Sequence, residues 1–106
     1  MMNHHAELGR AYGLLREGKL RDAETLCRAE LAKVPQSGAA MHLLGLIRKD
    51  SGDPAEGEQL MRQSIALEPR RAEFRTNLAN LLRRLGRLRE AEAAFREALA
   101  LDPANA

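Results

Sequence analysis

Few residues of this sequence have the types and the spacing that metal chemistry needs. Two adjacent histidines, His4 and His5, stand close to the N-terminus, and Cys27 is the single cysteine of the chain. Neighbouring histidines on a helix point in different directions, so they do not converge on one ion. One cysteine provides neither an internal disulfide nor a zinc framework. We therefore predict no metal site and no cofactor.

Groups for nucleophilic or acid–base catalysis are also missing from the sequence. No glycine-rich phosphate loop follows a strand pattern. The context of a nucleophile elbow is lacking at the serines of the chain, which are Ser37, Ser51 and Ser64. Two closely spaced acidic pairs fall in the first turns of predicted helices, where a carboxylate interacts favourably with the helix dipole: Glu56 with Glu58, and Glu90 with Glu92. The sequence therefore predicts no catalytic residue and a chain that is not an enzyme.

The charge of the chain is nearly balanced, with 17 basic against 15 acidic side chains and a formal net charge of +2. Its most basic stretches are Arg70–Arg71 and Arg83–Arg84. Recognition of nucleic acid would need basic residues interleaved with aromatic rings on which bases stack. Aromatic residues make up 3% of the chain, and they are Tyr12, Phe74 and Phe95. We therefore predict no nucleic-acid partner.

The composition favours helices, because the dominant Ala, Leu, Arg and Glu lose little rotamer freedom in a helix. Charged residues make up 30% of the chain with both signs interspersed, which is typical of a folded domain rather than of disorder. The first ten residues lack the apolar core of a secretory signal, and no apolar run approaches transmembrane length. We predict a cytoplasmic protein without a membrane partner.

The strongest pattern in the sequence is a repeat of 34 residues. This period separates the glycines Gly18, Gly52 and Gly86 and the prolines Pro35, Pro69 and Pro103. Small residues recur at Ala11, Gly45 and Ala79 and again at Ala23, Gly57 and Ala91. Bulky apolar residues recur at Cys27, Met61 and Phe95. Packing explains all three of these last positions, whereas a catalytic thiol would explain one.

Each 34-residue unit divides into two helices with a glycine between them and a proline after the second. The apolar spacing predicts helices over residues 4–17, 20–33, 38–51, 54–67, 72–85 and 88–101. One pair of amphipathic helices cannot bury its apolar stripe alone, but stacked pairs bury it continuously. The predicted fold is therefore all-α, an α-solenoid of three antiparallel helix–turn–helix repeats. It forms a single domain over residues 1–106, with repeats at about 4–37, 38–71 and 72–105.

The period and its signposts resemble the tetratricopeptide repeat (TPR) family. The third unit matches the family signature best, at Leu78, Ala79, Gly86, Ala91, Phe95, Ala98 and Pro103. The early tryptophan site of the family is not aromatic here and is occupied by Glu7, Met41 and Arg75. Arg10 stands at a usual leucine site of the first unit. The resemblance implies a right-handed superhelical array.

The resemblance also implies a protein-interaction module whose first helices line a concave groove for a peptide or helix of a partner. The side of each first helix opposite its small packing residue gives the candidate lining: Leu8, Tyr12 and Leu15; His42, Leu46 and Lys49; Thr76, Asn80 and Arg83. This lining changes from apolar to basic along the chain, so Lys49 and Arg83 favour an acidic segment. Leu8 and Leu15 have an alternative place in the core of an irregular first helix.

One TPR subclass binds the C-terminal carboxylate of heat-shock chaperones through a Lys/Asn/Arg clamp. The corresponding positions here are Leu8, Tyr12, Leu43, Glu73 and Asn77. Nearly all of the clamp charges are absent, so the sequence predicts no binding of a chaperone tail.

Two other functions remain open from the sequence. The last predicted helix is followed by three residues after Pro103, so its outward apolar stripe is expected to be exposed. That arrangement is typical of a piece of a longer array, or of a self-assembling module that pairs through this helix. The third hypothesis is a targeting appendage of an enzyme, such as a glycosyl- or sulfotransferase, whose catalytic part lies outside this chain.

Overall fold

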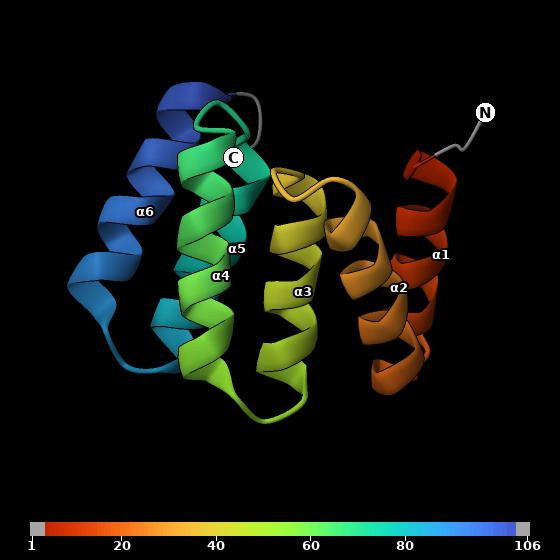
Figure 1. The fold of residues 1–106 in the computed structure, drawn as a ribbon. Coiled ribbons are helices and arrows are strands. Elements are labelled where there is room, and N and C mark those ends of the chain that lie inside the picture. Colours follow the sequence, from red (N-terminus) through yellow and green to blue (C-terminus); the bar gives the residue numbers. More distant parts are fainter. Residues whose placement is uncertain (1–3, 104–106) are drawn as a thin grey trace.

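The structure is a computed structural model that describes residues 4–103, and these form helices joined by short turns (Figure 1). The helices are α1 (His4–Arg16), α2 (Leu20–Lys33), α3 (Gly38–Asp50), α4 (Pro54–Leu67), α5 (Ala72–Arg84) and α6 (Leu88–Leu101). No strand occurs between residues 4 and 103. The predicted all-α class is confirmed, and each predicted helix end agrees with the structure to within one residue. The side chains of His4 and His5, for which the sequence predicts no metal site, lie outside the described side chains.

The turn inside each hairpin requires a glycine. Gly18, Gly52 and Gly86 have φ of 79°, 99° and 80°, in the left-handed region that costs other residues about 1–2 kcal/mol. The next backbone N–H reaches back to the helix in each turn, as in the 2.8 Å bond that Lys19 donates to the Leu14 carbonyl. This geometry satisfies the last carbonyls of the first helix and fixes the second helix antiparallel to it.

The two helices of the second repeat, α3 and α4, each begin at a side-chain N-cap. The Ser37 hydroxyl accepts the backbone N–H of Ala40 at 3.1 Å, at the start of α3. The Asp53 carboxylate accepts the N–H of Glu56 at 3.1 Å, and Pro54 follows it as the first residue of α4. Proline suits this position because its fixed φ and missing donor cost nothing there.

Small residues allow the two helices of a hairpin to approach closely. A Cβ atom added to Gly57 would lie 2.8 Å from the Gly45 carbonyl oxygen, so the backbones of α3 and α4 are in contact. The equivalent pairs in the other hairpins, Ala11 with Ala23 and Ala79 with Ala91, are buried. The small residues therefore have the packing role that the repeat predicted.

The hairpins stack in chain order from α1 at one edge of the molecule to α6 at the other (Figure 1). One continuous apolar core runs from Ala11 in α1 to Ala94 in α6, which confirms the α-solenoid. Cys27 is fully buried in this core, and burial raises the pKa of its thiol to about 12. The thiol is therefore protonated, and it packs like its repeat equivalent Met61.

Candidate peptide-binding groove

A hollow of about 430 Å³ crosses the first helices of all three hairpins. It is lined by Tyr12, Leu15, Arg16, Leu46, Lys49, Asp50 and Asn77. These residues come from α1, α3 and α5, so the hollow lies on the face that the sequence indicated. Four of the nine predicted lining residues meet there: Tyr12, Leu15, Leu46 and Lys49.

Besides Arg16, α1 contributes Tyr12 and Leu15 to the hollow, which offer apolar surface. Tyr12 has 47% of its surface exposed, and Leu15 is half-buried. Leu8 and Leu15 both pack partly against the central core, so each has one side in the core and one side toward solvent. Leu15 therefore both packs against the core and lines the hollow. Leu8 packs against the core but is not among the residues that line the hollow.

The α3 side of the hollow brings charges together. The Lys49 ammonium lies 3.4 Å from the Asp50 carboxylate, and Arg16 stands exposed in the last turn of α1. Sequence reasoning missed Arg16 and Asp50, although each directly follows a predicted lining residue on the same helix. Lys49 is paired with Asp50, whereas Arg16, which also lines the hollow, has no ion pair with any residue between 4 and 103.

His42 occupies a buried position between α3 and α5. Its ring is 4% exposed and stacks on Phe74 with the ring centroids 4.3 Å apart. The Asn77 amide nitrogen lies 2.9 Å from His42 Nε2, and the Arg71 guanidinium lies 4.5 Å from the centre of the Phe74 ring. The structure therefore corrects the predicted place of His42, because Phe74 covers the ring and leaves little surface for a ligand.

The protonation of His42 follows from this burial. Burial, together with the smaller effect of the positive charges of Arg71 and Lys49, lowers the pKa of His42 to about 4. The imidazole is therefore neutral at pH 7, and Nε2 accepts the hydrogen bond from Asn77. The other ring nitrogen, Nδ1, is buried and has no hydrogen-bond partner within residues 4–103.

The α5 residues predicted for the groove lie outside the hollow. Thr76 and Asn80 are half-buried and Arg83 is exposed, but none of the three lines it. Asn77, one position after Thr76, lines it instead. The repeat does indicate that Asn77 faces a neighbouring hairpin, because the equivalent residue of the second unit, Leu43, is buried.

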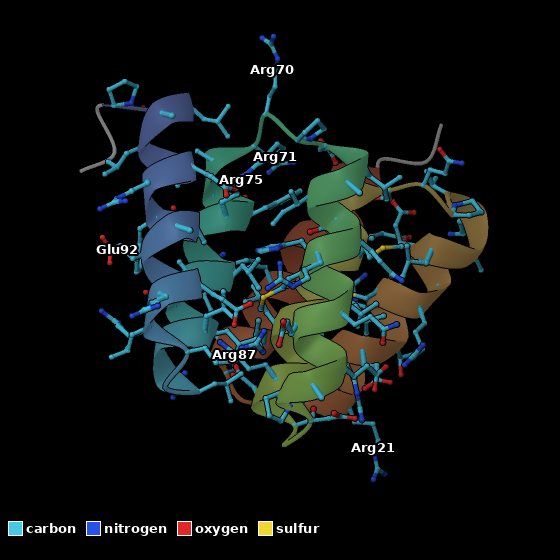
Figure 2. All side chains as sticks on the ribbon, turned by 90° about the vertical axis from the view of Figure 1, so that its left-hand side faces the viewer. Arg21, Arg70, Arg71, Arg75, Arg87 and Glu92 are labelled. Carbon is cyan, nitrogen blue, oxygen red and sulfur yellow. The ribbon has the colours of Figure 1, made fainter. Side chains whose placement is uncertain are left out.

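A second hollow, of about 290 Å³, lies between α4, α5 and α6. Its floor is apolar, and ion pairs stand at its rim: Arg75 with Glu97 at 3.1 Å and Arg62 with Glu90 at 3.7 Å. Figure 2 shows Arg75 and Arg87 in the space between α6 and α4. These charged side chains are already paired with each other, so this hollow offers a ligand fewer unpaired charged groups than the first hollow does.

The described part of the chain has neither a cluster of metal-ligating side chains nor a membrane-spanning helix. No group of three or more His, Cys, Asp or Glu side chains is placed to hold a metal ion there. None of the helices described is long and apolar enough to cross a membrane.

Comparison with known families gives a match over residues 42–106 to the model of the tetratricopeptide repeat. The chain belongs to the tetratricopeptide repeat family. The match covers the second hairpin from His42 onward and the third hairpin. The TPR resemblance is thereby confirmed.

Relatives of this TPR chain include parts of larger proteins. The probable biofilm formation methyltransferase WspC of Pseudomonas aeruginosa is 34% identical over 65 residues, which is 61% of this chain and 15% of WspC. The O-GlcNAc transferase of Thermobaculum terrenum (a K341M mutant) has a TM-score of 0.86 and 30% identity, over 97% of this chain and 21% of that one. The chain thus spans a small part of each of these proteins.

A third similar structure is a complex. The type III secretion chaperone SycD of Yersinia enterocolitica, bound to a peptide of the translocator YopD, has a TM-score of 0.81 and 20% identity. The similarity covers 92% of this chain and 75% of the SycD chain. At this identity the likeness concerns the fold alone.

Proposed function

We propose that this TPR chain is a protein-interaction module that binds a peptide or helix of a partner protein in the hollow across α1, α3 and α5. The observation that carries the proposal is the meeting of an exposed tyrosine with basic side chains in one concave site, at Tyr12, Arg16 and Lys49. An exposed aromatic ring beside cations is typical of an interaction surface. The SycD complex supports the proposal because a chain of the same fold binds a peptide.

The chemistry of the hollow indicates a ligand with two features. Tyr12 and Leu15 offer contact to an apolar side chain, and Arg16 and Lys49 offer charge-assisted hydrogen bonds to a carboxylate. Arg83 lies beyond the hollow, on the same helix as Asn77, and extends the positive charge for a longer segment. We therefore expect a ligand with an apolar anchor close to an acidic residue.

A peptide-display library tests this site without knowledge of the natural partner. Wild-type protein should enrich peptides that combine an apolar residue with Asp or Glu, and Tyr12→Ala should weaken their binding about tenfold or more. Tyr12 is largely exposed, so this change leaves the fold intact. The matched control is Arg21→Ala on α2, whose side chain projects away from the body of the molecule (Figure 2).

The library result has two outcomes against the proposal. Peptides that bind Tyr12→Ala as tightly as wild type would place recognition elsewhere, and no enrichment at all would remove the module function. Asn80→Ala with Arg83→Ala measures how far the site extends along α5: unchanged affinity limits it to the hollow, with α1 and α3 as its main walls.

A second candidate function is favoured by two relatives, since WspC is named as a probable methyltransferase and the Thermobaculum protein as an O-GlcNAc transferase. We propose that the module then serves as a targeting appendage that brings a protein substrate to a catalytic domain. The gene sequence on both sides of residues 1–106 tests this: a catalytic domain in the same reading frame supports it, and its absence from the gene product rules it out.

A further inference from the structure

The helix α6 lies at the edge of the molecule (Figure 1), and its outer face carries exposed leucines. Leu88 is 63% exposed, Leu99 is 43% exposed, and Phe95 is half-buried between them. Met61, the repeat equivalent of Phe95 in α4, is fully buried, because α4 packs against the next hairpin. The α6 face, defined as Leu88, Glu92, Phe95, Arg96 and Leu99, therefore has the character of a covered surface without a cover among the residues described.

The interfaces between neighbouring hairpins, here called seams, lie between the first and second hairpins and between the second and third. At both seams the next hairpin supplies a charged partner as well as apolar contact. Glu24 accepts hydrogen bonds from Arg28 on its own helix at 2.8 Å and from Arg48 of the next hairpin at 3.2 Å. Glu58, 34 residues later, accepts them from Arg62 at 3.0 Å and from Arg87 of the next hairpin at 2.5 Å. At each seam, this glutamate takes one guanidinium from its own helix and one from the element packed beside it.

Glu92 is the third glutamate of this series and has half of that arrangement. It pairs with Arg96 on its own helix at 2.5 Å, and residues 4–103 offer it no second guanidinium. Figure 2 shows Glu92 pointing away from α4. The surface that covers the α6 face should therefore bring apolar side chains together with an arginine or lysine.

The opposite edge of the molecule does not match the α6 face. The α1 residues Gly9, Arg10 and Gly13 are all exposed. Arg10 stands at the repeat position where Leu44 and Leu78 are buried in the inner hairpins. Head-to-tail stacking of copies would therefore set the leucines of α6 against glycines and a charge.

We propose that the α6 face binds the same face of a second copy in an antiparallel pair with two-fold symmetry. A two-fold axis between Glu92 and Phe95 places Leu88 opposite the leucine at position 99 of the other copy. The same axis places each Glu92 beside the other copy's arginine at position 96, which supplies the second guanidinium in both directions. Each contact occurs twice, as an isologous interface requires.

This dimer is weak and leaves the concave hollow free. One helix face buries less surface than a standard protein interface, so we expect association in the micromolar to millimolar range. The hollow is lined from α1, α3 and α5, so pairing through α6 does not depend on peptide binding. The proposed dimer and the proposed peptide-binding site can therefore be tested independently.

Charge-reversal variants of the full chain test the pairing by analytical ultracentrifugation over a concentration series. Glu92→Arg and Arg96→Glu should each weaken the dimer about tenfold, since both reciprocal ion pairs become repulsive. A mixture of the two variants should associate at least as tightly as wild type, because each then carries the charge that the other lacks. Circular dichroism checks that both variants keep their helices.

Lys19→Glu is the matched control, because Lys19 is an exposed charge at the N-terminal edge. It should leave the dimer unchanged, whereas head-to-tail stacking would bring that edge close to Glu92 and make the variant weaker. A wild-type chain that stays monomeric up to millimolar concentration overturns the proposal. So does a variant mixture that associates no better than either variant alone.

Discussion

The seam between the first and second hairpins and the seam between the second and third have the same geometry and different chemistry. At equivalent repeat positions the first seam has Leu8 and Leu43, and the second has His42 and Asn77. Leu43 is buried and Leu8 packs against the same core, whereas His42 and Asn77 lie 2.9 Å apart, Nε2 to Nδ2. The 34-residue period places the side chains, but it does not determine whether a seam is apolar or polar.

The difference has a cost and a consequence. A buried apolar pair has no titratable group and needs no hydrogen-bond partner, but each member of a buried polar pair depends on the other to satisfy its polar atoms. The second seam offsets part of this cost by adding Phe74, where the first seam has Ala40. The ring of Phe74 covers His42 on one side and meets the Arg71 guanidinium, so it links the two hairpins.

Removal of the Phe74 ring should cause the largest loss of stability among the changes that distinguish the two seams. Phe74→Ala gives the second seam an alanine, like Ala40 in the first seam. The second seam lacks the apolar pair of Leu8 with Leu43 that accompanies Ala40 in the first. The loss of a fully buried ring should lower the free energy of unfolding by about 3–5 kcal/mol. Chemical denaturation measures the change.

Phe95→Ala is the matched control for that substitution. Its ring is half-buried, so the same chemical change should cost about half as much or less. Equal losses for the two variants would mean that the stack on His42 adds nothing to the stability of the second seam.

Acidification should break the second seam and spare the first. The folded-state pKa of His42 is about 4, below the ordinary value of 6.5, so the unfolded chain binds the proton more readily. Stability is therefore complete above pH 6.5 and falls as the pH drops toward 4. By pH 4.5 the loss should be about 2–3 kcal/mol.

The carboxylates contribute in a lower pH range, which separates the two effects. The hydrogen bond from Arg28 lowers the pKa of Glu24, so its contribution is lost below the ordinary glutamate range. Unfolding free energies at pH 7, 6, 5 and 4.5 then report mainly on His42. A flat profile over this range would show that the folded chain protonates His42 without opening the seam.

Much of this arrangement could be predicted from the sequence, and the exceptions have a common cause. The period and apolar spacing predict local helices and the turns at Gly18, Gly52 and Gly86, since these depend on nearby residues. The position of His42 on its helix predicts a place in the groove lining. Its burial depends on Phe74, 32 residues away and on another helix, and no spacing within one repeat reveals that neighbour.

Asn77 illustrates the same limit from the other side. Its place on the helix predicts a seam position like that of Leu43, yet it both lines the hollow and donates to His42. Asn77 therefore belongs both to the interface with the second hairpin and to the lining of the hollow. The sequence of a single repeat cannot show this double role, because His42 lies in the preceding hairpin.

Exchange of the polar pair for the apolar one should have the smallest net effect and the clearest interpretation. Asn77→Leu alone leaves both ring nitrogens of His42 buried without a partner, so it should cost about 1–3 kcal/mol in unfolding free energy. The double change His42→Leu with Asn77→Leu copies the apolar pair of the first seam and should recover most of that loss, because no orphaned polar atom remains. The double variant should also lose the slope of stability between pH 6.5 and 4.5. A double variant less stable than Asn77→Leu would mean that the second seam is shaped for the polar pair, and that the two seams differ in geometry as well as in chemistry.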